Sequence, residues 1–207
     1  MQETKLFLIT YFAALIGVIP PGLVNMTVAK TCVEKGKKNG LYVAFGATIV
    51  VFLQALIAVL LAKYIFGNTY VQNILLRAGL VVFTLLGVYF FIMAKRKKGL
   101  PNSSRRANAN SIFKGMLVAG LNVFPIPFFV ALAGAMNVGV GVEYDWSLII
   151  AFVLAASMGS FTTLYFYVLS FVSIEEKAEK FARYSNYFMA ILMLVLVIIT
   201  IFRIYNL

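Results

Sequence analysis

The chain has 207 residues, of which 62% are hydrophobic and 12% are charged, and its formal net charge is +11. Soluble domains are about half apolar, and the excess here lies in long apolar blocks. Composition therefore excludes an ordinary soluble domain and predicts an integral membrane protein whose partner is the lipid bilayer. The basic residues lie between the apolar blocks, where cytoplasmic loops of membrane proteins carry them, so we expect no nucleic-acid partner.

The residues that would support catalysis, redox chemistry or metal binding are scarce. There is one cysteine and no histidine, which excludes an internal disulfide. All seven acidic residues fall in the N-terminal tail or in the links: Glu3, Glu34, Glu143, Asp145, Glu175, Glu176 and Glu179. The apolar stretches therefore offer no carboxylate or imidazole for proton relay or metal ligation. We expect no enzymatic activity, no metal and no cofactor.

Six stretches are long and apolar enough to cross a membrane, which takes about 20 residues of helix. In chain order they are residues 6–29, 41–62, 74–94, 112–136, 146–172 and 186–204. The link at 173–185 is predicted to form a short interfacial helix, because Ser173 and Glu176 have capping-box spacing. The predicted fold class is an all-α integral membrane protein with six transmembrane helices.

Prolines and glycine interrupt the first and the fourth of these stretches. Pro20, Pro21 and Gly22 lie inside the first, and Pro125 and Pro127 lie inside the fourth. Each proline removes a backbone donor and clashes with the preceding helical turn. In lipid, the backbone groups freed in this way need a partner or an enclosed polar cavity. We therefore predict that the first and fourth helices are broken at these prolines.

The two interruptions are half a chain apart, since Pro125 follows Pro20 by 105 residues. Each occurs in the first of three apolar stretches, and because three is odd the second set enters the membrane from the opposite side. We predict one transporter domain built from two inverted repeats, about 1–94 and 112–207. Paired interruptions of this kind point to a binding site near the midplane. The alternative is that the prolines are simply tolerated, as they are in many membrane helices.

Basic residues predict the orientation of the chain. The links at 30–39, 95–111 (counted with Lys114) and 173–185 hold four, seven and three Lys or Arg residues, fourteen in all. The opposite side holds three, namely Lys5, Lys63 and Arg203. By the positive-inside rule, we expect these links to be cytoplasmic. Both termini would then lie outside the cytoplasmic membrane.

Polar residues beside the two interruptions are the first candidates for a substrate site. Asn25 and Thr27 follow the first interruption, and Asn122 precedes the second. Amides donate and accept hydrogen bonds, and half-helix ends add partial positive and negative charge. A zwitterion with a carboxylate and an ammonium would suit such a pair. The alternative, which is compatible with it, is that both asparagines satisfy backbone groups freed by the prolines.

Buried polar residues in the second and fifth stretches are further candidates. Gln54 lies near the middle of the second stretch and should face the helix bundle, because an unpaired buried amide is costly. Ser160 and Thr163 share one face of the fifth stretch. Substrate contact and helix–helix hydrogen bonding are equally compatible with Gln54, and close helix packing explains the small hydroxyl residues as well.

Four sequence features occur together: Pro20-Pro21-Gly22-Leu23-Val24-Asn25, the basic link Glu34-Lys35-Gly36-Lys37-Lys38-Asn39-Gly40, Gly46 in the second stretch, and Asn122 with Pro125 in the fourth. In these motifs and in its layout, the chain resembles the LysE-type (lysine exporter) family of amino-acid exporters. The resemblance implies export of amino acids or similar small metabolites, driven by the gradient of a coupling ion.

Other functions on this helical plan stay open. They are a metal-ion exporter, a membrane thiol-transfer protein and a non-transporting membrane scaffold. The lack of buried acids and histidine disfavours the first, and the single cysteine, Cys32, disfavours the second. Assembly into a homo-oligomer is compatible with the sequence.

Overall fold

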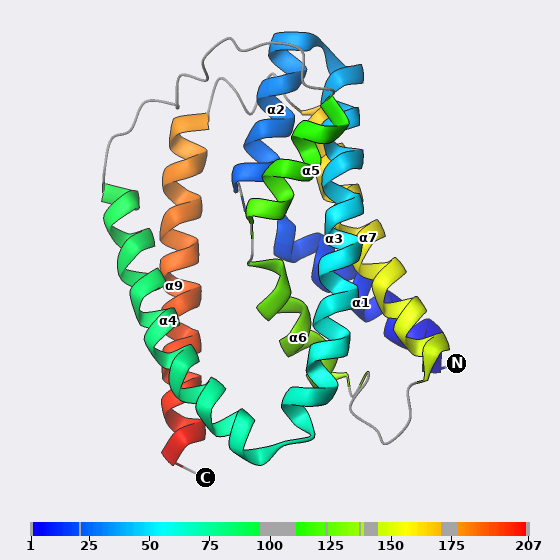
Figure 1. Ribbon diagram of the computed structural model, residues 1–207. Coiled ribbons are helices and arrows are strands. Elements are labelled where there is room, and N and C mark those ends of the chain that lie inside the picture. Colours follow the sequence, from blue (N-terminus) through cyan, green and yellow to red (C-terminus); the bar gives the residue numbers. More distant parts are fainter. Residues whose placement is uncertain are drawn as a thin grey trace. The chain divides into compact units, whose positions relative to one another are not determined.

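The computed structural model describes residues 2–20, 22–95, 111–122, 124–136, 138, 145–170 and 178–205. No strand occurs in these ranges, which confirms the all-α class. The helices are α1 (Gln2–Val18), α2 (Leu23–Lys35), α3 (Lys37–Phe66), α4 (Thr69–Lys95), α5 (Ser111–Leu121), α6 (Pro125–Ala135), α7 (Trp146–Leu169) and α9 (Ala178–Tyr205) (Figure 1).

Both predicted helix breaks are present. The chain bends by 69° between α1 and α2 and by 68° between α5 and α6. The first break ends at Gly22, which precedes α2, and the second ends at Pro125, the first residue of α6. The prolines thus interrupt the helices as predicted, because a proline inside a helix removes a backbone donor and clashes with the preceding turn.

By length and composition, α3 and α7 could each cross a membrane, and so could each bent pair if it counts as one span. Within the described part of α4 and α9, only the shorter apolar stretches Phe83–Ile92 and Met193–Phe202 qualify. Large apolar side chains such as Phe45 and Leu53 of α3 are exposed. Such side chains are stable facing lipid, so the structure supports a multi-pass membrane protein.

Helices α3, α4 and α9 are longer than the sequence predicts, and the links before α3 and α4 are correspondingly shorter. The predicted link at 63–73 is reduced to Gly67 and Asn68. There the Asn68 side chain accepts hydrogen bonds from the backbone N–H groups of Tyr70 and Val71, which starts α4 early. At the predicted link 30–39, a single residue, Gly36, joins α2 to α3 with a φ of 85° that favours glycine.

The separate interfacial helix predicted at 173–185 is wrong over residues 178–185. These residues are the first part of α9, which continues without interruption to Tyr205. Residues 173–177 lie outside the described ranges. From Ala178 onward, therefore, the chain is part of one long helix rather than the end of a short one.

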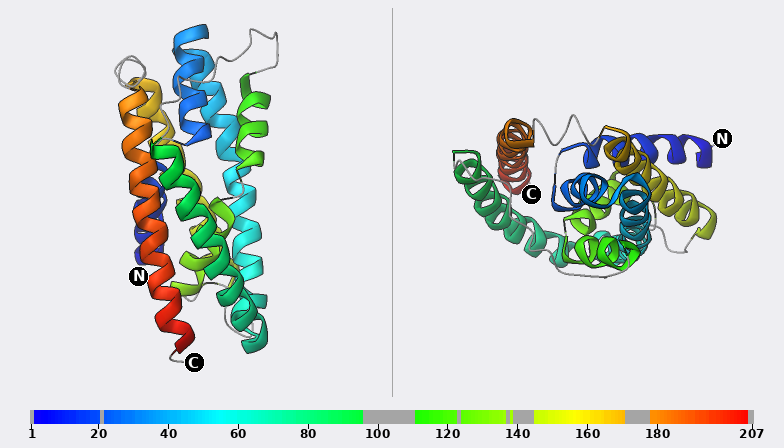
Figure 2. Two further views of the ribbon diagram at one scale, coloured as in Figure 1. Left: turned by 90° about the vertical axis from the view of Figure 1, so that its left-hand side faces the viewer. Right: turned by 90° about the horizontal axis from the view of Figure 1, so that it is seen from above.

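The described helices form two compact units, and each unit draws on both halves of the sequence. The first unit, Met1–Gly67 with Arg106–Glu176, contains α1, α2, α3, α5, α6 and α7. The second, Asn68–Arg105 with Lys177–Leu207, contains α4 and α9. These two helices lie side by side in every view (Figure 1; Figure 2). All candidate site residues belong to the first unit.

In the first unit, α1 packs on α7 and α5 packs on α3, while α3 and α7 contact each other. Glycines allow both the contact between α1 and α7 and the contact between α3 and α5. A Cβ atom added to Gly46 would overlap the carbonyl of Ile112, and one added to Gly115 would overlap that of Val43. A Cβ atom on Gly159 would overlap the carbonyl of Tyr11 in the same way. Small residues let membrane helices approach closely, and here they bring each long helix against a half-helix.

Two apolar clusters fill the first unit. The first cluster consists of Leu6, Ala14, Val51, Ala55, Ala58, Val59, Ala62, Phe129, Ala133, Val138, Ile149, Phe152, Val153 and Ala156. The second cluster consists of Val24, Val28, Ala29, Cys32, Val43, Ala44, Ala47, Ala119, Leu164, Tyr167 and Val168. Along α3 and α7, one cluster gives way to the other near the middle of each helix. The two breaks occur where the half-helices pass from one cluster to the other.

Candidate functional site

Asn25 holds the first break together from inside. Its side-chain Nδ2 donates hydrogen bonds to the carbonyl oxygens of Val18 and of Pro20, the latter at 3.0 Å. The Asn25 side chain is 4% exposed. These carbonyls have lost the N–H groups that a continuous helix would have supplied. Asn25 therefore has the capping role that was one of its two predicted roles.

Helix α7 supplies further donors to the first break. Thr163 donates to the carbonyl of Leu15 at 2.8 Å, and the Tyr167 hydroxyl donates to that of Ile19 at 2.7 Å. Tyr167 also interacts with the Asn25 side chain. Thr163 and Tyr167 are four positions apart and share one face of α7. The predicted residue Thr163 thus contacts the break directly.

At the second break the donor comes from α3. The Nε2 atom of Gln54 donates to the carbonyl oxygens of Ala119, at 3.2 Å, and Asn122, at 2.8 Å. Ala119 is in the last turn of α5 and Asn122 directly follows the helix, where carbonyls lack the partners of a continuous α-helix. The predicted residues Gln54 and Asn122 are therefore brought together, although Asn122 takes part through its backbone carbonyl.

Each break receives side-chain hydrogen bonds from the other half of the chain. Helix α7 of the second half donates to the first break, and helix α3 of the first half donates to the second break. The breaks also meet: a Cβ atom added to Gly17, beside the first break, would lie 3.0 Å from the Phe128 ring beyond the second. The two breaks, each held by its own polar side chains, are therefore neighbours in the first unit.

The remaining predicted residues lie around the breaks with different exposures. Pro20, Thr27 and Pro125 are partly exposed, and Gly22 and Pro127 are exposed. Thr27 donates to the carbonyl of Leu23 within its own helix. Pro21 lies outside the described residues.

Among the residues that the structure describes, three buried polar side-chain atoms have no hydrogen-bond partner: Oγ1 of Thr10, Oε1 of Gln54 and Oγ of Ser160. Serine and threonine in helices commonly bond to the carbonyl four residues earlier, as Thr27 and Ser157 do. The predicted residue Ser160 is 1% exposed and does not. A bound polar molecule could form the hydrogen bonds that these three atoms lack.

The half-helices that leave the breaks differ in the donors they offer. Helix α2 begins after Gly22, has no side-chain cap and has no acidic residue in its first turn. Its first N–H groups therefore carry uncompensated partial positive charge. Helix α6 begins with Pro125, and Pro127 follows two residues later, so two of its first three residues have no N–H group. The first break is thus richer in donors than the second.

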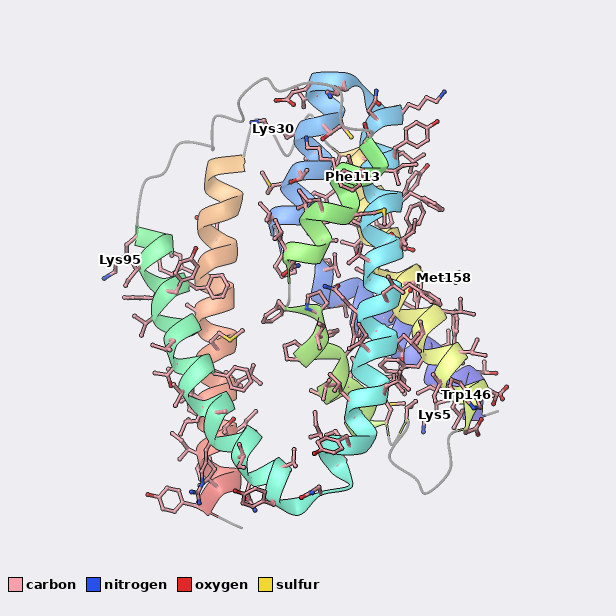
Figure 3. All side chains as sticks on the ribbon, viewed as in Figure 1. Lys5, Lys30, Lys95, Phe113, Trp146 and Met158 are labelled. Carbon is pink, nitrogen blue, oxygen red and sulfur yellow. The ribbon has the colours of Figure 1, made fainter. Side chains whose placement is uncertain are left out.

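Charged groups mark the two ends of the first unit. At one end, Lys114 of α5 donates to the Thr31 hydroxyl of α2 at 3.0 Å, and Lys30 pairs with Glu34 at 3.8 Å. Lys5 and Trp146 lie at the other end (Figure 3). The basic residues of α2 and α5 and those at the start of α3 therefore gather around one end of the unit.

At the other end, Asp145 caps α7. Its carboxylate accepts hydrogen bonds from the Ser147 hydroxyl at 2.8 Å and from the backbone N–H groups of Ser147 and Leu148. These bonds, the Ser147 hydroxyl first, hold the pKa of Asp145 below its ordinary value. The Ser147 hydroxyl also lies 2.6 Å from Glu3 Oε1, which links the start of α1 to the start of α7.

Three residues that the structure singles out, two at the breaks and the buried Thr10 of α1, were not among the predicted site residues. Tyr167 could have been included, because it lies one turn after Thr163 on the same face. Thr10 has a weaker signal, as a lone hydroxyl in an apolar stretch. Phe128 has none, because its neighbour Gly17 is 111 residues away in the sequence and only the tertiary fold brings them together.

The fold and the site define a class: a multi-pass membrane protein in which two broken helices meet at a polar level inside a helical unit. The chain matches the family model of the LysE type translocator over residues 15–202, and it belongs to this family. The resemblance seen in the sequence is thereby confirmed. The chain is a membrane protein of a small-molecule export family. No curated protein matches it significantly, and neither does any solved structure.

Proposed function

We propose that the chain is a secondary transporter that exports amino acids or similar small metabolites across the cytoplasmic membrane. The observation that carries this proposal is the pair of breaks. They bend by 69° and 68°, and each is held by side chains from the opposite half of the chain. Transporters with inverted repeats bind substrate where discontinuous helices of both halves meet.

The two breaks differ in a way that suits a zwitterion. The start of α2 offers uncapped N–H groups to a carboxylate. The end of α5 offers carbonyl oxygens and the negative end of its dipole to an ammonium. Amides, hydroxyls and backbone would therefore recognise the substrate, with Asn25, Gln54, Ser160 and Thr163 around it.

Alternating access is the transport mechanism that we propose. Six spans arranged as two inverted repeats would rock around the fixed level of the breaks. The packing of α1 on α7 and of α5 on α3 supports this arrangement. In each contact, the first helical segment of one half packs on the second spanning stretch of the other half. Both termini would lie outside and the basic end of the first unit would be cytoplasmic. A proton or sodium gradient would drive export.

Efflux from proteoliposomes tests the function and the site together. Vesicles that contain the purified chain are loaded with the twenty proteinogenic amino acids labelled with ¹³C, and a proton or sodium gradient is imposed. Mass spectrometry of the external medium is expected to find at least one labelled amino acid that empty vesicles retain. Absence of efflux for all twenty, under both gradients, would reject amino-acid export.

The variant Asn25→Ala tests the site. It leaves the carbonyls of Val18 and Pro20 without their donor, so the first break should lose its geometry and efflux should fall at least about tenfold. Thr48→Val is the matched control, because Thr48 donates only within α3, to Ala44. Full efflux by folded Asn25→Ala protein would reject the assignment of Asn25 to the site.

A further inference from the structure

Of the two polar atoms of the Gln54 side chain, Nε2 forms hydrogen bonds and Oε1 does not. Its Nε2 atom donates to the carbonyls of Ala119 and Asn122. Because carbonyl oxygens only accept, the nitrogen must face them, and this fixes the orientation of the amide. The Oε1 atom therefore points away from these carbonyls but stays beside the second break.

The Oε1 atom is buried without a hydrogen-bond donor. The Gln54 side chain is 5% exposed, and Oε1 has no partner among the described residues. A buried acceptor normally finds a partner, because leaving it unsatisfied is costly. The position therefore calls for a donor that the described residues do not supply.

The surroundings of Oε1 favour a positively charged donor. The end of α5 contributes the negative end of a helix dipole, and the proline-rich start of α6 contributes few N–H groups to oppose it. No group of three or more His, Cys, Asp or Glu residues suited to a metal occurs among the described residues. An organic ammonium, with three donors, matches this arrangement of neutral acceptors.

The first break does not offer an equivalent place. Its carbonyls already receive hydrogen bonds from Asn25, Thr163 and Tyr167. The other two buried unpaired atoms among the described residues, Thr10 Oγ1 of α1 and Ser160 Oγ of α7, belong to hydroxyls, which can donate as well as accept. Gln54 Oε1 is therefore the one unpaired buried atom of the described residues that can only accept, and it lies at the second break.

We propose that Gln54 is a specificity-determining residue, whose Oε1 atom accepts a hydrogen bond from the ammonium group of the substrate. This inference rests on the proposed function as an amino-acid exporter and assigns the ammonium end of the substrate to the second break. Gln54 Nε2 holds the end of α5 in place while Oε1 reads the ammonium.

Competition binding to the purified chain in detergent tests the inference. The probe is the tritiated form of the amino acid with the fastest efflux from the proteoliposomes. The competitors are the same amino acid and its desamino analogue, which keeps the carbon skeleton and the carboxylate but has hydrogen in place of the ammonium. We expect the desamino analogue to bind roughly 10- to 100-fold more weakly to the wild type, the range of a hydrogen bond to a charged group.

Gln54→Met isolates the role of Oε1. Methionine matches glutamine in length but accepts no strong hydrogen bond, so the discrimination should fall to about threefold or less. Loss of the Nε2 hydrogen bonds weakens both ligands together and does not change their ratio. Thr48→Val, six residues away on α3, should keep the wild-type ratio. An unchanged ratio in Gln54→Met, or no discrimination by the wild type, would overturn the inference.

An infrared measurement keeps the inference testable if Gln54→Met does not fold. The chain has three glutamines, Gln2, Gln54 and Gln72. With Gln2→Asn and Gln72→Asn, and with ¹³C-labelled glutamine, the side-chain carbonyl band reports on Gln54 alone. The band should move to lower frequency when the amino acid binds and stay in place with the desamino analogue. Equal bands with both ligands would refute the contact, whereas absence of any amino-acid efflux would refute the proposed function itself.

Discussion

The Tyr167 hydroxyl lies 2.7 Å from the carbonyl oxygen of Ile19, immediately beyond the end of α1. The two residues are 148 positions apart in the sequence. A side chain of the second half thus closes the break of the first half. Gln54 of the first half does the same for the second break. Each half therefore supplies side-chain donors that replace backbone hydrogen bonds lost at the prolines of the other half.

Tyr167→Phe should lower the free energy of unfolding by about 1 kcal/mol, because one carbonyl at the break loses its donor. Thermal unfolding of the purified protein in detergent measures the change. Tyr165→Phe is the matched control, because Tyr165 is 41% exposed and its ring contact with Phe161 survives the substitution. Equal shifts in the two variants would show that the Tyr167 hydroxyl does not support the break.

Alanine at the glycines between the helices should destabilise the first unit. Gly46→Ala, Gly115→Ala and Gly159→Ala each place a methyl group against a neighbouring backbone carbonyl, and overpacking of this kind costs about 1–3 kcal/mol. Gly120→Ala is the control, since a Cβ atom there meets nothing within 4 Å. Melting temperatures of the four variants would contradict the close packing if Gly120→Ala were as unstable as the others.

Asp145 should make stability depend on pH through its cap of α7. Hydrogen bonds hold its pKa below the ordinary value in the folded protein. Its contribution is therefore complete above the ordinary pKa and is lost as the pH falls through the lowered folded value. Asp145→Ala should lower the melting temperature at pH 7, and the difference from the wild type should shrink below about pH 4.

Asp145→Asn separates the cap from the charge. Asparagine still caps a helix start but does not titrate, so this variant should retain most of the stability at pH 7. It should also lose less stability on acidification than the wild type. If Asp145→Ala and wild type differed equally at pH 7 and at pH 3, a titrating cap would be ruled out.

Thiol labelling tests the proposed orientation. Glu3 and Lys38 are exposed near opposite ends of the first unit, and the native thiol of Cys32 is buried. A membrane-impermeant maleimide applied to intact cells should label Glu3→Cys, and it should label Lys38→Cys only after permeabilisation. The wild type is the control for reaction at Cys32. The reverse pattern would place the basic end outside.

Much of the fold is readable from the sequence, because its cause is local. The breaks at Pro20 and Pro125 follow from the chemistry of proline itself. The apolar stretches follow from the requirements of a spanning helix, and the family follows from motifs that stand in the chain. Helix ends were less well predicted: Asn68 and Gly36 shorten two links through capping and turn geometry that the apolar pattern does not contain.

The sequence alone determined that this is an all-helical membrane protein with two proline-broken helices half a chain apart, since composition and proline act without reference to distant residues. Only the tertiary structure decided which partners satisfy the broken backbone. Asn25 was expected either to bind substrate or to satisfy freed carbonyls, and Gln54 either to bind substrate or to join helices, and the fold shows both side chains donating to carbonyls at the breaks. It also leaves Gln54 Oε1 unpaired, because hydrogen bonds between helices depend on which faces meet, and no local pattern in the chain encodes that.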